Sequence, residues 1–129
     1  MILLDTHVVI WLAEMPEELS LRAREAIVQE RQDDGLAISD KSLWELAHLI
    51  ARGRIVVKTS LRDFLRAVER NFTVLPVTAA IAERSVTFSE GYPKDPTDRL
   101  IGATAVVHGL RLLTKDVLIH GSKEVDCIW

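Results

Sequence analysis

Five short, largely apolar runs constrain the fold of this chain more than any other feature of its sequence. They are Ile2–Leu4, Leu36–Ile38, Val74–Val77, Leu110–Leu113 and Val125–Trp129. Each of the first four is followed by polar residues, and the fifth closes the sequence. Runs of this kind are typical of parallel strands that are covered on both faces of a sheet. The sequence therefore predicts five buried strands.

Helical patterns occupy the stretches between these runs. They cover Ser20–Gln32, Ser42–Arg52, Ser60–Asn71, Ala79–Val86 and Asp95–His108. Ser60 opens a capping box, Thr78 can cap the helix that follows it, and Pro96 and Gly109 bound the last helix at the positions that these residues prefer. Alternating strands and helices predict an α/β/α sandwich around a mainly parallel sheet.

Length and composition favour one domain over residues 1–129. A chain of 129 residues that is 48% apolar and 27% charged can bury its own core. No apolar run approaches the ~20 residues that span a bilayer, and no basic region precedes an apolar stretch, so we expect neither a membrane span nor a signal peptide. The single cysteine, Cys127, cannot form an intrachain disulfide, which favours a cytoplasmic location.

The net charge of −3 says little about the partner of this chain. It gives no support to a sequence-independent DNA coat, which needs a basic surface to displace counterions. It does not exclude an enzyme that acts on nucleic acid, because bound divalent cations can supply positive charge locally.

Four acidic residues are expected to converge at one edge of the sheet. Asp5 and Asp116 follow the first and fourth strands, where sites form in open parallel sheets. Glu45 and Asp98 lie in the first turns of two connecting helices. Because such helices run antiparallel to the strands, their N-termini lie at the same edge of the sheet. The sequence therefore predicts one cluster of four carboxylates.

A cluster of carboxylates favours a bound cation. Two carboxylates ~4 Å apart repel by roughly 4 kcal/mol at an effective dielectric near 20. Either some of them are protonated or a cation lies between them. Oxygen ligands favour Mg²⁺ or Mn²⁺, and such an ion can activate water and neutralise the charge that builds on a phosphodiester during attack.

Each acid also has a purely structural explanation. Glu45 lies three residues after Ser42 and could complete a capping box, and Asp98 could simply favour the positive end of its helix, with Asp95 as the N-cap. The two acids that follow strands could be ordinary turn residues. Taken singly, the structural and functional explanations are equally good, so the shared edge is what favours a site.

Four segments together resemble PIN-domain proteins, and most of all the VapC-type toxins of bacterial toxin–antitoxin pairs. They are Asp5-Thr6-His7 with Trp11-Leu12, Ser42–Leu46, Asp95–Ile101 and Leu113–Asp116. The resemblance runs from residue 2 to about residue 128, with the segments in order. It implies a PIN-like five-stranded sheet of order 3-2-1-4-5, in which the first and fourth strands are neighbours and their two aspartates face each other.

The resemblance also implies an activity and partners. Asp5, Glu45 and Asp98 match the three core acids of the family, and Asp116 matches the fourth. Asp95 is either an auxiliary acid or, as we favour, a helix cap. The family consists of Mg²⁺- or Mn²⁺-dependent endoribonucleases that leave a 5′-phosphate and a 3′-hydroxyl. They act as homodimers and are inhibited by a cognate VapB-like antitoxin, whose C-terminal segment crosses the site and often places a basic residue near the acids.

Other polar residues near the acids have weaker assignments. Thr6 and Thr114 could orient carboxylates or bound water, but capping or solvent exposure is favoured for both. His7 could contact RNA, although we favour a structural role. For Arg99, phosphate binding and pairing with a neighbouring acid stay open.

Aromatic and basic residues could contribute to RNA binding. Trp11 and Trp44 could stack on bases, but burial in the core or at a dimer interface is favoured. Lys94, Arg52 and Arg54 are candidates for contacts with the RNA backbone, although ordinary solvated surface is the favoured interpretation of each.

Other function classes fit less well. A haloacid-dehalogenase-like enzyme needs Asp-x-Asp where this chain has Asp5-Thr6-His7, and a receiver domain needs an acidic pair for which no room precedes Ile2. No Gly-rich phosphate loop or Cys/His array is present, and Glu45–His48 is only one of the two Glu-x-x-His copies that a di-iron bundle needs. The remaining alternatives are a catalytically silent PIN-like module that binds RNA or protein, which the intact acids disfavour, and cleavage of DNA or flap structures.

Overall fold

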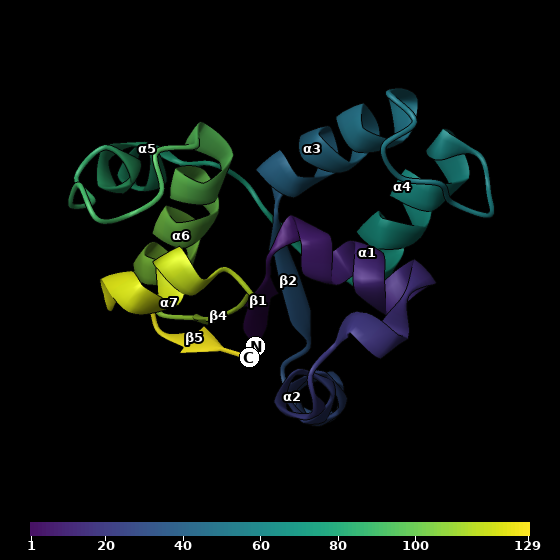
Figure 1. The fold of residues 1–129 in the computed structure, drawn as a ribbon, viewed down its shortest axis with the longest axis horizontal. Coiled ribbons are helices and arrows are strands. Elements are labelled where there is room, and N and C mark those ends of the chain that lie inside the picture. Colours follow the sequence, from purple (N-terminus) through teal and green to yellow (C-terminus); the bar gives the residue numbers. More distant parts are fainter.

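A wholly parallel five-stranded sheet of order β3-β2-β1-β4-β5 forms the centre of the computed structural model, which describes residues 1–129 (Figure 1). The strands are β1 (Ile2–Leu4), β2 (Leu36–Ser39), β3 (Thr73–Leu75), β4 (Arg111–Leu113) and β5 (Cys127–Ile128). In the register, Leu3 of the central strand pairs with Ala37 on one side and Leu112 on the other. The predicted α/β class and strand order are confirmed.

Helices cover both faces of this sheet. They are α1 (Thr6–Glu14), the short 3₁₀ helix η1 (Pro16–Glu18), α2 (Leu21–Gln32), α3 (Asp40–Ala51), α4 (Leu61–Asn71), α5 (Ala79–Ser85), α6 (Pro96–His108) and α7 (Val117–Ser122). Helices α1–α4 lie over one face and α5–α7 over the other (Figure 1). None of them combines the length and the apolar character needed to cross a bilayer.

The side chains of β1 alternate between two apolar cores. Ile2 and Leu4 belong to the core under α1–α4, whereas Leu3 belongs to the core under α5–α7. All three side chains are fully buried. Because successive side chains of a strand point to opposite faces, a central strand that is covered on both faces must be apolar throughout, as this run is.

Helix α3 begins earlier than the sequence predicts, and this changes the explanation of one acid. The helix starts at Asp40, because the Ser39 hydroxyl accepts a hydrogen bond from the Lys41 amide at 3.1 Å and caps it. Ser42 is therefore inside the helix, where its buried hydroxyl accepts a hydrogen bond from Thr6 at 3.0 Å. The proposed capping box of Ser42 with Glu45 is wrong, and the structure gives Glu45 no capping role.

The other predicted caps are confirmed. Ser60 and Thr78 accept hydrogen bonds from the third residue after each of them, at 3.1 and 3.3 Å. Asp95 caps α6 by accepting a hydrogen bond from the Thr97 amide at 2.7 Å, and Gly109 ends that helix with a φ of 63°. Strand β3 stops at Leu75 rather than continuing to Val77, because proline follows and has no amide hydrogen for the ladder.

Tyr92 fixes the first turn of α6 against the sheet. Its ring is 1% exposed, stacks on Phe88 with ring centroids 3.9 Å apart, and donates a hydrogen bond from its hydroxyl to the Asp98 carbonyl at 3.1 Å. The ring lies directly over Gly102, which leaves no room for a side chain at that position.

Gly102→Ala is expected to destabilise the fold by about 1–3 kcal/mol, the usual cost of overpacking a core. The new Cβ would overlap the Tyr92 hydroxyl and lie 2.8 Å from its ring carbon Cζ, so the tyrosine must move. Urea unfolding followed by circular dichroism measures the change. Gly121→Ala, where nothing lies within 4 Å of the added Cβ, is the matched control and should not lose stability. Equal stability of the two variants would contradict this packing argument.

Candidate functional site

The four predicted acids converge on one pocket beyond the carboxyl ends of β1 and β4. The pocket has a volume of about 270 Å³ and is lined by Asp5, His7, Val8, Trp11, Glu45, Asp95, Asp98, Lys115 and Asp116. Asp5 follows β1 and Asp116 follows β4, while Asp98 lies in the first turn of α6. Glu45 lies in the second turn of α3, because that helix begins at Asp40. The predicted convergence of these side chains at one edge of the sheet is therefore confirmed.

Both carboxylate oxygens of Asp5 are held by the protein. Oδ1 accepts a hydrogen bond from the Thr6 amide at 2.7 Å and so caps α1, while Oδ2 accepts one from the Thr114 hydroxyl at 2.8 Å. Burial raises the pKa of the Asp5 carboxyl above its ordinary value, and the Thr114 hydrogen bond offsets part of that effect. Asp5 is thus fixed in orientation and costly to ionise unless a cation is near.

Thr114 connects two of the acids. Its hydroxyl donates to Asp5 and accepts a hydrogen bond from the Asp116 amide at 3.1 Å, and its carbonyl lies 2.7 Å from Nε2 of His120. The Thr114 side chain is fully buried, so the expectation of capping or solvent exposure was wrong for it. It was also wrong for Thr6, which is buried and links α1 to α3 through its hydrogen bond to Ser42.

The remaining acids keep free oxygens in the pocket. Asp116 caps α7 through Oδ1, which accepts hydrogen bonds from the amides of Leu118 and Ile119 at 2.8 and 3.3 Å. Its Oδ2 accepts no hydrogen bond from the protein, and neither do the carboxylates of Glu45 and Asp98. Asp116 can therefore cap α7 through Oδ1 and still offer Oδ2 to a ligand in the pocket.

Asp98 shows the electrostatic effect of the cluster. Burial, followed by repulsion from the other pocket carboxylates, raises the pKa of Asp98 to about 7. A carboxyl whose pKa is raised in this way in a pocket is typical of a functional site. Without a cation, the ionised carboxylates of the folded protein therefore repel one another.

Asp98→Asn is expected to remove part of the pH dependence of stability. An acid whose pKa is raised on folding binds a proton better in the folded state, so the stability that depends on it falls as pH rises from its ordinary pKa of 3.8 to about 7. Since solvent screens this partly exposed group, we expect a gain of ~1 kcal/mol, or about 4 °C in melting temperature, at pH 8 and none at pH 4. Thermal melts of the metal-free protein at both pH values test this. An equal change at both would contradict it.

Two residues of the pocket were not expected there. His7, for which a structural role was predicted, is exposed and lines the pocket beside Trp11, with ring centroids 6.0 Å apart. Lys115 was not singled out from the sequence, although it stands between Thr114 and Asp116, and its Nζ lies 5.6 Å from the centre of the Trp11 ring. Trp11 is half-buried against Trp129, consistent with the packing role that was favoured.

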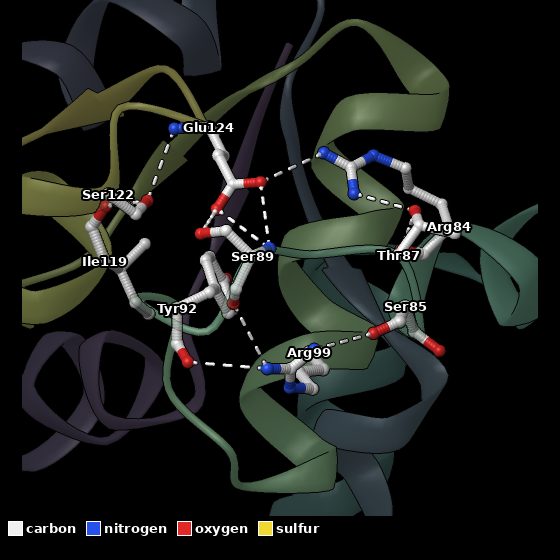
Figure 2. Close-up of polar contacts among 9 residues, drawn as sticks. All are labelled: Arg84, Ser85, Thr87, Ser89, Tyr92, Arg99, Ile119, Ser122 and Glu124. Carbon is white, nitrogen blue, oxygen red and sulfur yellow. Dashed lines mark hydrogen bonds and ion pairs between the residues drawn. The ribbon is translucent and has the colours of Figure 1, made fainter.

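Arg99 does not pair with a neighbouring acid, which was one of the two roles left open by the sequence. Its guanidinium donates hydrogen bonds to the backbone carbonyls of Ser85, Ser89 and Tyr92 at 3.4 to 3.5 Å (Figure 2). It also donates one to the Pro93 carbonyl at 3.0 Å. These carbonyls belong to the end of α5 and to the segment that leads into α6. Arg99 therefore organises the segment that precedes Asp95, and its hydrogen bonds go to backbone carbonyls rather than to an acid.

Glu124 holds the same segment from the other side. Its carboxylate accepts hydrogen bonds from the Ser89 hydroxyl at 2.7 Å and from the Ser89 amide, and it lies 3.9 Å from the Arg84 guanidinium (Figure 2). The hydrogen bonds from Ser89 lower the pKa of Glu124 below its ordinary value. The segment before α6 is thus tied both to that helix and to the C-terminal part of the chain.

The donor set of the pocket fits a hydrated magnesium or manganese ion. No group of three or more His, Cys, Asp or Glu side chains already has the arrangement of a complete metal site. Mg²⁺ usually keeps several waters and takes only one or two carboxylates directly. A pocket rich in carboxylates, with free oxygens and raised acid pKa values, matches that preference better than it matches zinc, which favours several nitrogen or sulfur ligands where this pocket has only His7.

Comparisons with known proteins agree with this arrangement. The family model of the PIN domain matches residues 2–119. Ribonuclease VapC22 of Mycobacterium tuberculosis is 37% identical over 115 residues, which cover 89% of this chain and 86% of that protein. Among solved structures, VapBC2 of Rickettsia felis bound to a promoter DNA fragment is similar with a TM-score of 0.77, at 15% identity, over 99% of this chain and 98% of that one. A toxin–antitoxin complex of Klebsiella pneumoniae is similar with a TM-score of 0.64, at 26% identity, over 91% and 88%.

Proposed function

The chain belongs to the PIN-domain family, and from this premise we propose that it is an endoribonuclease that acts as the toxin of a toxin–antitoxin pair. The observation that carries the proposal is the convergence of Asp5, Glu45, Asp98 and Asp116 on one pocket, in a chain similar over most of its length to a ribonuclease. Four intact acids favour catalysis over the alternative of a silent PIN-like module that binds RNA or protein.

The reaction proposed is hydrolysis of an RNA phosphodiester with Mg²⁺ or Mn²⁺ as cofactor. The four acids would hold the ion directly or through water, and the ion when bound would supply an activated water and neutralise charge on the phosphate. Asp5 enters the reaction already oriented by Thr6 and Thr114. Without a cation the pKa of Asp98 is about 7, so protons and a divalent cation would compete for this carboxylate near neutral pH.

A cognate VapB-like antitoxin, a homodimeric state and a cytoplasmic location complete the proposal. Solved structures of similar fold include several toxin–antitoxin complexes. A pocket rich in carboxylates is also a suitable receptor for a basic side chain of an inhibitory partner, because it supplies opposite charge in a partly buried setting. Size measurements of the chain alone and with a co-expressed antitoxin test the two association states.

The experiment that tests the activity is incubation of protein freed of any partner with a pool of cellular RNAs and Mn²⁺. Discrete cleavage products with 5′-phosphate ends are the expected result, since in the proposed reaction water attacks the phosphorus, the P–O3′ bond breaks and the 3′-oxygen leaves as a hydroxyl. Single-stranded DNA of matched sequence is the control substrate. Binding of RNA without cleavage would support the silent module. Preferred cleavage of the DNA would identify DNA, and not RNA, as the substrate.

Thr114→Val is expected to lower the rate of RNA cleavage by about 10- to 100-fold, the usual effect of removing a group that orients a metal ligand. The valine loses the hydrogen bond to Asp5 and the one from the Asp116 amide, while the volume of the side chain is kept. Thr114→Ser keeps the hydroxyl and should retain most of the activity. Single-turnover rates with melting temperatures separate this effect from loss of fold. Equal rates for the two variants would contradict an orienting role.

A further inference from the structure

A second pocket extends along α3 from the acid pocket. This α3 groove has a volume of about 500 Å³ and is lined by Lys41, Trp44, Glu45, His48, Leu49, Arg52, Arg54, Asp95, Pro96 and Thr97. Glu45 and Asp95 line both pockets, so the groove is continuous with the acid cluster. A polymer that enters the acid pocket can therefore extend into the groove without leaving the surface.

Trp44 is the prominent aromatic side chain of the α3 groove. It is 53% exposed, so the burial in the core that was favoured for it does not occur in this chain. Its neighbours are polar: the Lys41 Nζ lies 3.7 Å from the ring centroid, and the His48 ring lies 4.0 Å away. A partly exposed lysine over an exposed indole makes an interaction of only about 1 kcal/mol, which a stacked nucleobase can replace.

Three cations of the α3 groove have no acidic partner. Lys41, Arg52 and Arg54 take part in none of the ion pairs of the structure, which involve Arg84, Arg111 and the N-terminal amine. Arg52 and Arg54 are also exposed. Unpaired cations gathered in one groove of a chain whose net charge is −3 form a local site for polyanions.

The acid pocket creates a need for such a site. Phosphate groups are repelled by a cluster of carboxylates, so the affinity for an RNA chain must come from cations and stacking surfaces outside the cluster. The α3 groove offers both beside Glu45. A base can stack on Trp44 only if it is unpaired, which selects single-stranded RNA over a duplex.

We propose that the α3 groove binds the single-stranded part of the RNA substrate on one side of the scissile bond. In this arrangement one base stacks on Trp44, and Arg52 and Arg54 contact the phosphates that follow it. Lys41 is displaced from the indole and becomes available to the backbone. This inference rests on the proposed ribonuclease function and adds to it the path of the substrate.

Binding of RNA to the uncleaving Asp5→Asn protein tests the proposal. The probe is a fluorescein-labelled random single-stranded RNA of about 12 nucleotides, a length within the range of such grooves, and the readout is fluorescence anisotropy. Adding Trp44→Ala should raise the Kd about 10-fold, and Trp44→Phe should recover most of the affinity, because a phenyl ring still stacks. Photo-crosslinking of 5-iodouridine RNA should label Trp44.

The arginines are tested through the salt dependence of the same Kd. With Arg52→Ala and Arg54→Ala together, the slope of log K against log salt should fall by about 1.4, since each phosphate contact to a single strand contributes about 0.7. Arg62→Ala with Arg66→Ala is the matched control, because these arginines are exposed on α4 and do not line the groove. The control pair should leave the slope unchanged.

The outcomes separate this inference from the proposed function. If the wild-type protein cleaves RNA while the Trp44 and arginine variants bind and cleave as it does, the α3 groove is not the substrate path, although the ribonuclease activity stands. If Trp44→Ala instead splits a dimer into monomers and the crosslink falls elsewhere, the groove is an interface between copies and the proposal is wrong. If the wild-type protein neither binds nor cleaves RNA, the proposed function fails as well.

Discussion

Asp5→Asn is expected to reduce RNA cleavage by about 10³-fold or more while the protein stays folded. Asparagine is as good an N-cap as aspartate, so its oxygen can still accept the hydrogen bond from the Thr6 amide. It brings no negative charge to the pocket and is a poorer ligand for a cation. Because burial raises the pKa of the Asp5 carboxyl, the neutral variant should melt at or above the temperature of the wild-type protein at pH 8.

Loss of activity together with unchanged or higher stability is what distinguishes a catalytic acid from a structural one. Single-turnover cleavage assays and thermal melts of the same preparations measure the two properties. Asp33→Asn is the matched control, since Asp33 is exposed at the end of α2, outside the pocket, and should leave the rate unchanged. An Asp5→Asn protein that cleaves RNA at the wild-type rate would overturn the proposed role of the cluster.

Removal of divalent cations is expected to reduce RNA cleavage as strongly as Asp5→Asn does. Dialysis against a chelator should lower cleavage by about 10³-fold or more, and added Mn²⁺ or Mg²⁺ should restore it, because the carboxylates alone neither activate water nor shield the phosphate. Zn²⁺ should restore less, since the acids of the pocket supply oxygen ligands and His7 is the only nitrogen ligand among its histidines and cysteines. Activity that survives the chelator would exclude metal-dependent hydrolysis.

Cation binding can also be measured without any substrate. At pH 8, Mn²⁺ at about 100 times its Kd should add roughly 2.7 kcal/mol to the stability of the wild-type protein and raise its melting temperature by several degrees. The rise should be smaller at pH 5, where protons compete for Asp98. In the double variant Asp5→Asn with Asp98→Asn, the rise should be absent. A rise of equal size in that variant would place the cation elsewhere.

The strands and the acids could be predicted because both depend on local sequence. A run such as Ile2–Leu4 is apolar throughout because both of its faces are covered, and that pattern does not need a partner to be recognised. The position of an acid directly after a strand, or in the first turn of a connecting helix, then fixes its edge of the sheet. The convergence of the four acids followed from topology alone.

Helix starts could not be predicted equally well, because several capping residues compete. Ser39 and Ser42 are both good N-caps, and the local sequence favoured Ser42 because Glu45 follows it. The structure begins the helix after Ser39, and Ser42 then meets Thr6, which is 36 residues away in sequence. Such a long-range hydrogen bond leaves no local signal. Helices α1 and α7 were not predicted as segments for a similar reason: their caps, Asp5 and Asp116, were assigned to the site or to turns.

The supporting residues of the site were the least predictable. Thr114 reaches Asp5 across 109 residues of sequence, and the carbonyls that Arg99 binds have no sequence signature at all, because any residue supplies one. Trp44 was expected to be buried or at a dimer interface, since large apolar residues usually are, and its exposure beside Glu45 became evident only from the fold.

The position of β1 between β2 and β4 has a consequence for the synthesis of the protein. The pocket needs both Asp5 and Asp116, which lie far apart in sequence and are joined only when β4 pairs with β1. At 5–20 residues per second, a ribosome takes roughly 6–22 s to travel from one acid to the other. Throughout that interval a nascent chain contains only part of the acid cluster. Under the proposed function, a translation product truncated before β4 should therefore not cleave RNA, because it lacks Asp116 and the strand that brings it to Asp5.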